Sequence, residues 1–299
     1  MGLFRPMEPT ARFRSRLVNI IGHCSLGRGR RYNPAMNDTV PTDAETPKLL
    51  CPAPGIYVRQ EVDNITWIDM GDHLIVVDAL EVAGLEDEVM GLIASTTGGK
   101  PVRYLLNTHT HYDHVVLNEA FARRGAQIVN QVVSPLPADG RWFDGARRRV
   151  LMLPMGGAHT EEDCIVHVPD AGVLLAGDIC GWGVIPLVIN LRASTARTLV
   201  ATYRRLIDFN ADVIIPGHGP LATTADLRRW IDYFHAIIRK AKSKVSSGLS
   251  DEQIKADLAQ PPADMTHWWR LLKWKHQDTV AKVIKSVRRG FLDDYDLER

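Results

Sequence analysis

The chain has 299 residues, of which 45% are hydrophobic and 24% are charged, a composition typical of a soluble globular domain that can bury a sizeable core. Its 36 basic and 35 acidic residues leave a formal net charge of only +1, which argues against a global field that recruits nucleic acid or an anionic membrane. No run of about 18 apolar residues occurs, so we expect no membrane-spanning helix.

Residues 1–46 form a basic arm without regular patterning. Before Asp38 this arm contains seven arginines and only one acidic residue, Glu8. The arginines are Arg5, Arg12, Arg14, Arg16, Arg28, Arg30 and Arg31. The composition favours a flexible extension or a segment that packs on a neighbouring subunit. An organellar presequence is the alternative, because such segments are also rich in arginine and poor in acids.

The four cysteines lie far apart and contain no C-x-x-C pair: they are Cys24, Cys51, Cys164 and Cys180. This spacing argues against a thiolate zinc knot or a redox dithiol. Free thiols are the usual state in a reducing compartment, so we expect a cytoplasmic protein.

Short apolar runs bounded by turn residues begin at residue 55. Strands are expected at 55–59, 65–69 and 73–78, joined as an antiparallel meander. Asp78 closes the third strand, where its carboxylate could orient a ligand histidine or cap the next helix. A helix at 85–95, a strand at 102–106, a helix at 116–124 and a strand at 127–132 should follow.

The second half continues this alternation, which favours an α/β layered fold. Strands are expected at 150–154, 164–169, 172–177 and 212–216, with a helix at 196–209. Beyond residue 224 the period changes to three and four residues, typical of packed helices. Ser250 resembles an N-cap, and a helix at 265–289 carries Trp268, Trp269 and Trp274 as expected core or interface anchors. We therefore divide the chain into an extension (1–46), an α/β domain (47–224) and a C-terminal helical region (225–299).

A cluster of metal-capable side chains follows the expected strand 102–106. The pattern H-x-H-x-D-H spans His109, His111, Asp113 and His114, and alternate residues of extended backbone share a face. His109 and His111 can thus reach one ion while the chain turns and offers Asp113 and His114 to a second. The alternative is a polar loop with solvated histidines.

Three more strands lead to metal-capable groups in loops or turns that contain glycine: His159, Asp178 and His218. Seven nitrogen and oxygen ligands are too many for one tetrahedral zinc and suit two ions. Three histidines would hold one ion, two histidines and Asp113 the other, and Asp178 would bridge. Two such ions would generate hydroxide from a shared water.

The four motifs resemble, in order and over about residues 55–222, those of the metallo-β-lactamase fold superfamily. The resemblance implies an αββα sandwich of two mixed β-sheets flanked by helices, with a dinuclear site at one edge. It implies two divalent metal ions, usually zinc and sometimes iron or manganese. It assigns His109, His111 and His159 to the first ion and Asp113, His114 and His218 to the second, with Asp178 bridging.

The bridging aspartate separates the branches of this superfamily. β-Lactamases of this fold generally lack it, so Asp178 favours the glyoxalase II-like, lactonase-like and thioesterase-like branches. We expect a hydrolase that cleaves an ester, thioester, lactone or amide in a small acyl substrate through a metal-bridging hydroxide, with Asp113 also handling the proton.

The alternatives are an iron-dependent thiol or persulfide dioxygenase, a non-catalytic scaffold and, as a minor one, a β-lactam hydrolase. Metal identity and oxygen consumption separate the dioxygenase from the hydrolase. We expect a small-molecule substrate and neither nucleic acid nor a membrane as partner, and we leave a homo-oligomer open.

Overall fold

The computed structural model describes residues 47–180, 191–265 and 271–296, without the side chains of 271–274. All of these residues belong to one compact unit, residues 31–299. The expectations for the basic arm and for the side chains of Trp268, Trp269 and Trp274 lie outside the described residues.

The first sheet has six strands in the order β1-β2-β3-β4-β5-β6. Strands β1 to β4 pair antiparallel, whereas β5 and β6 continue the sheet in parallel. The predicted meander is therefore confirmed. The strands are β1 (Lys48–Ala53), β2 (Ile56–Gln60), β3 (Ile65–Asp69), β4 (Leu74–Val77), β5 (Val102–Leu106) and β6 (Gln127–Val129).

The second sheet has five strands in the order β11-β10-β9-β8-β7. Only β10 and β11 pair in parallel. The strands are β7 (Arg141–Asp144), β8 (Arg149–Pro154), β9 (Cys164–Val168), β10 (Val173–Gly177) and β11 (Val213–Pro216).

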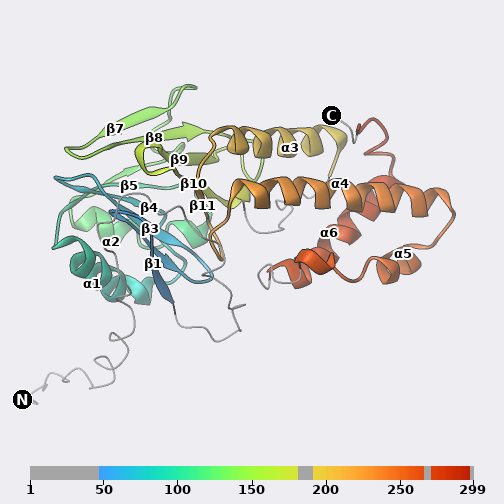
Figure 1. The fold of residues 1–299 in the computed structure, drawn as a ribbon, viewed down its shortest axis with the longest axis horizontal. Coiled ribbons are helices and arrows are strands. Elements are labelled where there is room, and N and C mark those ends of the chain that lie inside the picture. The colour runs from blue at the N-terminus through green and yellow to red at the C-terminus, as the bar shows by residue number, and fades with distance from the viewer. Residues whose placement is uncertain (1–46, 181–190, 266–270, 297–299) are drawn as a thin grey trace, which may run out of the picture. The chain divides into compact units, whose positions relative to one another are not determined.

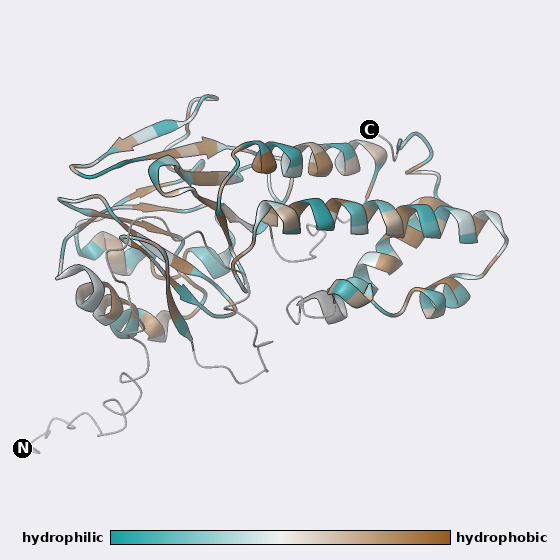
Figure 2. Cartoon of the chain, in the orientation of Figure 1, coloured by the Kyte–Doolittle hydropathy of each residue, from teal (hydrophilic) through white to brown (hydrophobic). Residues whose placement is uncertain are grey.

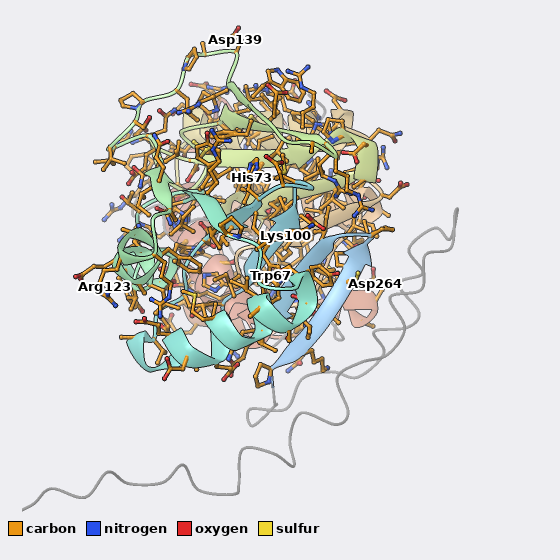
Figure 3. The ribbon with its side chains drawn as sticks, turned by 90° about the vertical axis from the view of Figure 1, so that its left-hand side faces the viewer. Trp67, His73, Lys100, Arg123, Asp139 and Asp264 are labelled. Carbon is orange, nitrogen blue, oxygen red and sulfur yellow. The ribbon has the colours of Figure 1, made fainter. Side chains whose placement is uncertain are left out.

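Four layers follow from the apolar clusters, and they confirm the predicted αββα sandwich (Figure 1). One cluster fills the space between the sheets, with Ile75 from the first and Val166 from the second. A second packs the outer face of the first sheet on α1 (Glu86–Thr97) and α2 (Asn118–Arg123). Trp67, behind α1 in Figure 3, donates from Nε1 to Thr96 Oγ1 of this helix at 2.8 Å.

The third cluster covers the outer face of the second sheet with α3 (Ala193–Asp208) and α4 (Thr224–Ser246), and continues into α5 (Asp251–Asp257) and α6 (Leu271–Arg288). Teal and brown residues alternate along α4 in Figure 2, because its apolar residues recur at helical spacing. Ser250 caps α5 as predicted, since its side chain accepts from Gln253 N. Short 3-10 helices are η3 (Ala83–Leu85), η4 (Tyr112–His114), η5 (Pro169–Ala171), η6 (Asp178–Cys180) and η7 (Ala263–Met265).

His276 belongs to the core of these helices. Its Nδ1 lies 2.7 Å from Tyr233 Oη and its Nε2 lies 2.7 Å from the carbonyl oxygen of Leu258. Both ring nitrogens are satisfied, so His276 has a structural role in this core. Among the described helices, none is long and apolar enough to cross a membrane.

Candidate metal centre

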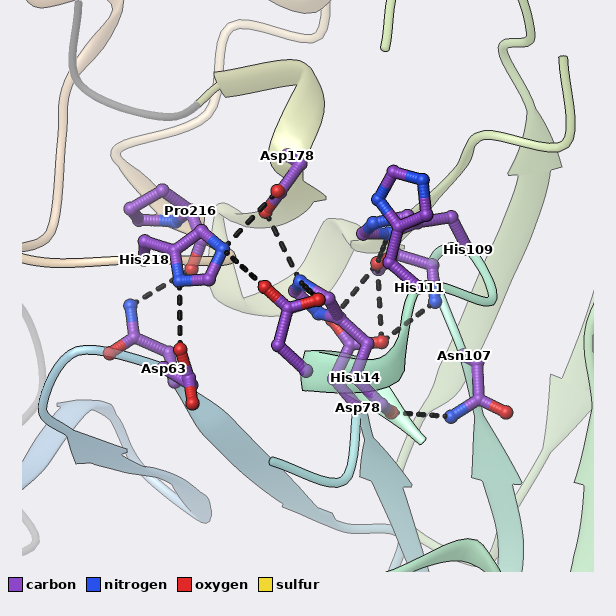
Figure 4. A network of polar contacts seen from close by, with 12 residues as sticks. Asp63, Asp78, Asn107, His109, His111, His114, Asp178, Pro216 and His218 are labelled. Carbon is purple, nitrogen blue, oxygen red and sulfur yellow. Dashed lines mark hydrogen bonds and ion pairs between the residues drawn. The ribbon is translucent and has the colours of Figure 1, made fainter. Parts of the chain in front are cut away.

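The seven predicted side chains lie together where β5, β8, β10 and β11 end. His109, His111, His114, Asp178 and His218 are labelled in Figure 4. They fall into two groups, and within each group one potential ligand atom per residue lies within 4.8 Å of all the others. The first group is His109, His111 and His159, and the second is Asp113, His114, Asp178 and His218.

The loop after β5 supplies four of the seven. His111 is extended, with φ −61° and ψ 151°, and η4 then turns the chain at Tyr112–His114. This change of backbone direction sends His109 and His111 to the first group and Asp113 and His114 to the second. The ring centroids of His109 and His114 are still only 4.2 Å apart, so the two groups adjoin.

His159 reaches the first group from a loop that Asp163 closes. One Asp163 carboxylate oxygen accepts from the backbone N–H of His159 at 2.7 Å and of Thr160 at 2.9 Å. The other accepts from the Thr160 hydroxyl at 2.7 Å. His159 Nε2 consequently lies 2.9 Å from His111 Nδ1. Two ring nitrogens this close either share a proton or direct both lone pairs at one cation.

Asp178 stands between the groups. Its Oδ1 lies 3.3 Å from His114 Nε2, and its Oδ2 lies 3.2 Å from His218 Nε2 and 3.5 Å from His159 Nε2. The glycines before Asp178 and His218 leave room for the side chains around the centre. A Cβ on Gly177 would overlap the Thr108 hydroxyl, and one on Gly217 would overlap Asp178 Oδ1.

Several polar atoms at the centre are buried without a hydrogen-bond partner among the described residues, including His109 Nε2, His114 Nε2 and Asp178 Oδ1. His114 Nε2 and Asp178 Oδ1 are near each other but lack hydrogen-bond geometry. An unsatisfied buried polar atom costs about 1–3 kcal/mol. Histidine nitrogens and carboxylate oxygens are donors that zinc and similar divalent ions accept. The residues therefore fit divalent metal binding.

Electrostatics differ between the two groups. Burial lowers the pKa of His109 to about 2 and also lowers the pKa of His159, so both rings are neutral at pH 7. Burial alone would lower the pKa of His114, but the carboxylates of Asp178 and Asp78 together raise it to about 10. Against the same effect of burial, Asp178, Asp113 and Asp63 raise the pKa of His218 well above its usual value.

The carboxylates of the second group respond in the opposite direction. Burial would raise the pKa of Asp178, but His114 and His218 hold it well below its usual range. Asp113 also has a lowered pKa, because the His218 hydrogen bond and the His114 charge outweigh its burial. Without an ion, protons on His114 and His218 balance these carboxylates, and a cation can displace those protons.

The contacts of Asp78 decide between the two roles expected for it, orienting a ligand histidine and capping the next helix. Asp78 Oδ2 lies 3.1 Å from His114 Nδ1, and Oδ1 accepts from the backbone N–H of Thr108 at 2.8 Å. The carboxylate thus fixes both a candidate ligand ring and the loop that carries it, and it does not cap a helix.

Several supporting residues were not predicted from the sequence. Asn107 donates from Nδ2 to the carbonyl oxygen of His114 at 3.0 Å, and its Oδ1 accepts from Asn118 and Asn130. Asp63 Oδ1 lies 3.0 Å from His218 Nδ1. Asp63 precedes His218 by 155 positions, so no local pattern connects them. Asp163, by contrast, follows Thr160 at the three-residue spacing typical of a capping pair.

Cys180 packs in the apolar cluster between the second sheet and α3, where it is 5% exposed. Its surroundings therefore support a packing role for this thiol.

The model of the metallo-beta-lactamase superfamily matches residues 59–129 and 128–218, a little more than half of the chain. No curated protein matches the chain significantly in sequence. Solved structures share the fold at low sequence identity. A metallo-beta-lactamase family protein from Thermus thermophilus has a TM-score of 0.53 and 20% identity, over 81% of this chain and 93% of that one.

Two further structures differ in how much of the chain they cover. A stereoselective inverting sec-alkylsulfatase from Pseudomonas sp. has a TM-score of 0.60 and 14% identity, over 80% of this chain and 50% of its own length. This chain thus spans half of the alkylsulfatase. A metallo-beta-lactamase from Pontibacter korlensis has a TM-score of 0.51 and 18% identity, over 61% of this chain and 96% of its own. The motif order, the sandwich and the matching family model agree, and the chain belongs to the metallo-beta-lactamase superfamily.

Proposed function

We propose that the protein is a dinuclear metal-dependent hydrolase that cleaves an ester, thioester, lactone or amide bond in a small acyl substrate. One observation carries the proposal: the Asp178 carboxylate lies within 3.5 Å of at least one histidine nitrogen from each of the two ligand groups. A carboxylate so placed can serve two ions at once.

The ligand assignment follows the two groups. His109, His111 and His159 would hold the first ion, and Asp113, His114 and His218 the second, with Asp178 shared. When bound, the two ions would acidify a water molecule and polarise the acyl carbonyl of the substrate. Zinc suits this donor set best, and iron or manganese are the alternatives.

Asp113 has a second role in this proposal. Its side chain is 19% exposed, more than that of Asp178 at 12%, and its Oδ2 lies 3.4 Å from His218 Nε2. Its pKa is lowered, so the carboxylate is ionised at neutral pH. Asp113 would orient the attacking water and accept its proton at a carboxylate oxygen.

The experiment is a metal analysis of the purified protein followed by a substrate panel. We expect close to two transition-metal ions per chain and hydrolysis of at least one thioester, lactone, ester or amide. A β-lactam and a secondary alkyl sulfate belong in the panel, because similar folds occur in proteins named for those activities. One iron per chain with oxygen consumption on a thiol or persulfide would replace the hydrolase by the dioxygenase alternative.

A further inference from the structure

The turn between β2 and β3 forms hydrogen bonds with the loop that carries His218. Asn64 donates its backbone N–H to the carbonyl oxygen of Gly217 at 2.8 Å. Its side-chain Nδ2 donates to the carbonyl oxygens of Pro216 at 2.9 Å and Gly219 at 2.8 Å. Asp63 and His218 also form an isolated antiparallel bridge. The backbone on both sides of His218 is thus fixed by residues from the other sheet.

The imidazole of His218 contacts the same turn. Its Nδ1 lies 3.0 Å from Asp63 Oδ1 and 3.0 Å from the carbonyl oxygen of Val62. Both oxygens are acceptors in this contact, so the proton stays on Nδ1. Nε2 then faces the ligand group, at 3.2 Å from Asp178 Oδ2 and 3.4 Å from Asp113 Oδ2 (Figure 4).

The carboxylate behind the ring distinguishes the second group from the first. His114 has Asp78 behind its Nδ1, and His218 has Asp63. In the first group, His109 Nδ1 lies 3.2 Å from a hydroxyl, that of Thr108. A carboxylate behind a ligand imidazole orients the ring and makes the ligand more basic.

We propose that Asp63 is a positioning residue that holds His218 Nε2 toward the second ion and thereby controls occupancy of the second site alone. This inference rests on the proposed function, because it concerns the same pair of ions. Asp63 is 7% exposed, and the imidazole that its carboxylate contacts belongs to the second group. Removing such a supporting carboxylate typically weakens metal affinity by about 10- to 100-fold.

The Val62 carbonyl remains when the Asp63 side chain is changed. The inference can therefore be tested in a variant that keeps the fold. In Asp63→Ala this oxygen can still accept the Nδ1 proton and Asn64 still holds the loop. Asp63→Asn keeps the shape and an acceptor oxygen but removes the charge. The matched control is Glu61→Gln, on the same turn, whose carboxylate pairs with Arg59 at 2.8 Å.

The measurement is a titration of the metal-free full-length chain with zinc, and with cobalt(II) to read the two sites from visible absorption. We expect wild type and Glu61→Gln to bind two ions. Asp63→Ala should bind the first ion as wild type does and the second about 10-fold more weakly or worse. Asp63→Asn should be intermediate, with a changed cobalt spectrum for the second site only.

Two results overturn the inference. One is an unchanged second affinity in both Asp63 variants, and the other is an equal loss at both sites, which would indicate a merely structural role. If Asp63→Ala does not fold, the near-isosteric Asp63→Asn decides by the same criteria. A wild-type protein that saturates at one ion would instead overturn the proposed function.

Discussion

His159 and His218 approach the same oxygen, Oδ2 of Asp178, with their Nε2 atoms at 3.5 and 3.2 Å. His159 follows β8 and His218 follows β11, so this oxygen joins loops from two non-adjacent strands of the second sheet. The two histidines belong to different ligand groups. The properties of the centre should therefore depend on the charge of one carboxylate.

The first prediction tests that charge with Asp178→Asn. The variant keeps three histidines for the first ion, while the second keeps His114, His218 and Asp113, so we expect mainly the second ion to be lost. Turnover should fall by about 100-fold or more, and the acidic limb of the pH–rate profile should move to higher pH. Asp170→Asn is the control, because that carboxylate pairs with Arg148 outside the centre at 3.4 Å. Two bound ions with an unshifted profile would rule out the shared-carboxylate model.

The second prediction separates the two ions. His111→Ala and His218→Ala each remove a ligand from a different group, so each variant should retain about one ion per chain and lose most activity. Both should stay folded, because the sandwich has its own apolar core. Metal content and thermal unfolding check the two halves of this expectation. Wild-type turnover in either variant would contradict the ligand assignment.

The third prediction concerns the glycine before His218. A Cβ at position 217 would overlap Asp178 Oδ1 and crowd the His114 ring, so Gly217→Ala should lose metal binding. Gly91→Ala is the matched control, because Gly91 lies within α1 and its added Cβ meets no atom within 4 Å. That variant should gain up to about 1 kcal/mol of stability, since alanine favours helix more than glycine does. Metal titration and unfolding of both proteins distinguish a local clash from a general effect of alanine.

Most of the sandwich could be predicted because its strands are short apolar runs between turn residues. The edge strands β1 and β7 were missed. β1 contains Pro52 and an irregular register between Leu50 and Ala53, which an edge strand tolerates but a sequence pattern does not reveal. β7 has only four residues, Arg141–Asp144, of which two are charged. Its pairing with β8 decides its conformation.

At the candidate site, local sequence patterns predicted the seven candidate ligands but not the residues that support them. The cluster His109 to His114 is contiguous in sequence, and each of the other three candidates lies within two residues of a glycine. Asp63 and Asn107 act through contacts with a distant loop or with backbone atoms. Such contacts exist only once the sheets have packed, so spacing along the chain cannot indicate them.

The last prediction is that the metal-free protein loses stability as pH rises from about 7 to about 8. In the folded state the pKa of His114 is raised from 6.5 to about 10, and that of His218 is raised as well. Across this window the unfolded chain releases protons that the folded chain retains, so the free energy of unfolding falls with pH. The stabilisation is complete below 6.5 and declines toward the folded pKa.

Other groups with shifted pKa values act mainly outside this window. The pKa values of His109, His159, His167, His235 and His276 are lowered, mainly by burial. These residues destabilise the folded state as pH falls through the unfolded value of 6.5, and their effect fades above about pH 7. Cys164, whose pKa burial raises to about 12, acts as pH rises toward its unfolded value of 9.0. Thermal unfolding in a chelator should show the decline between about pH 7 and 8, on the order of 1 kcal/mol per pH unit. The zinc-loaded protein should not show it, because its ligand histidines have already released their protons. A flat profile for the metal-free protein would show that His114 and His218 do not carry the retained protons.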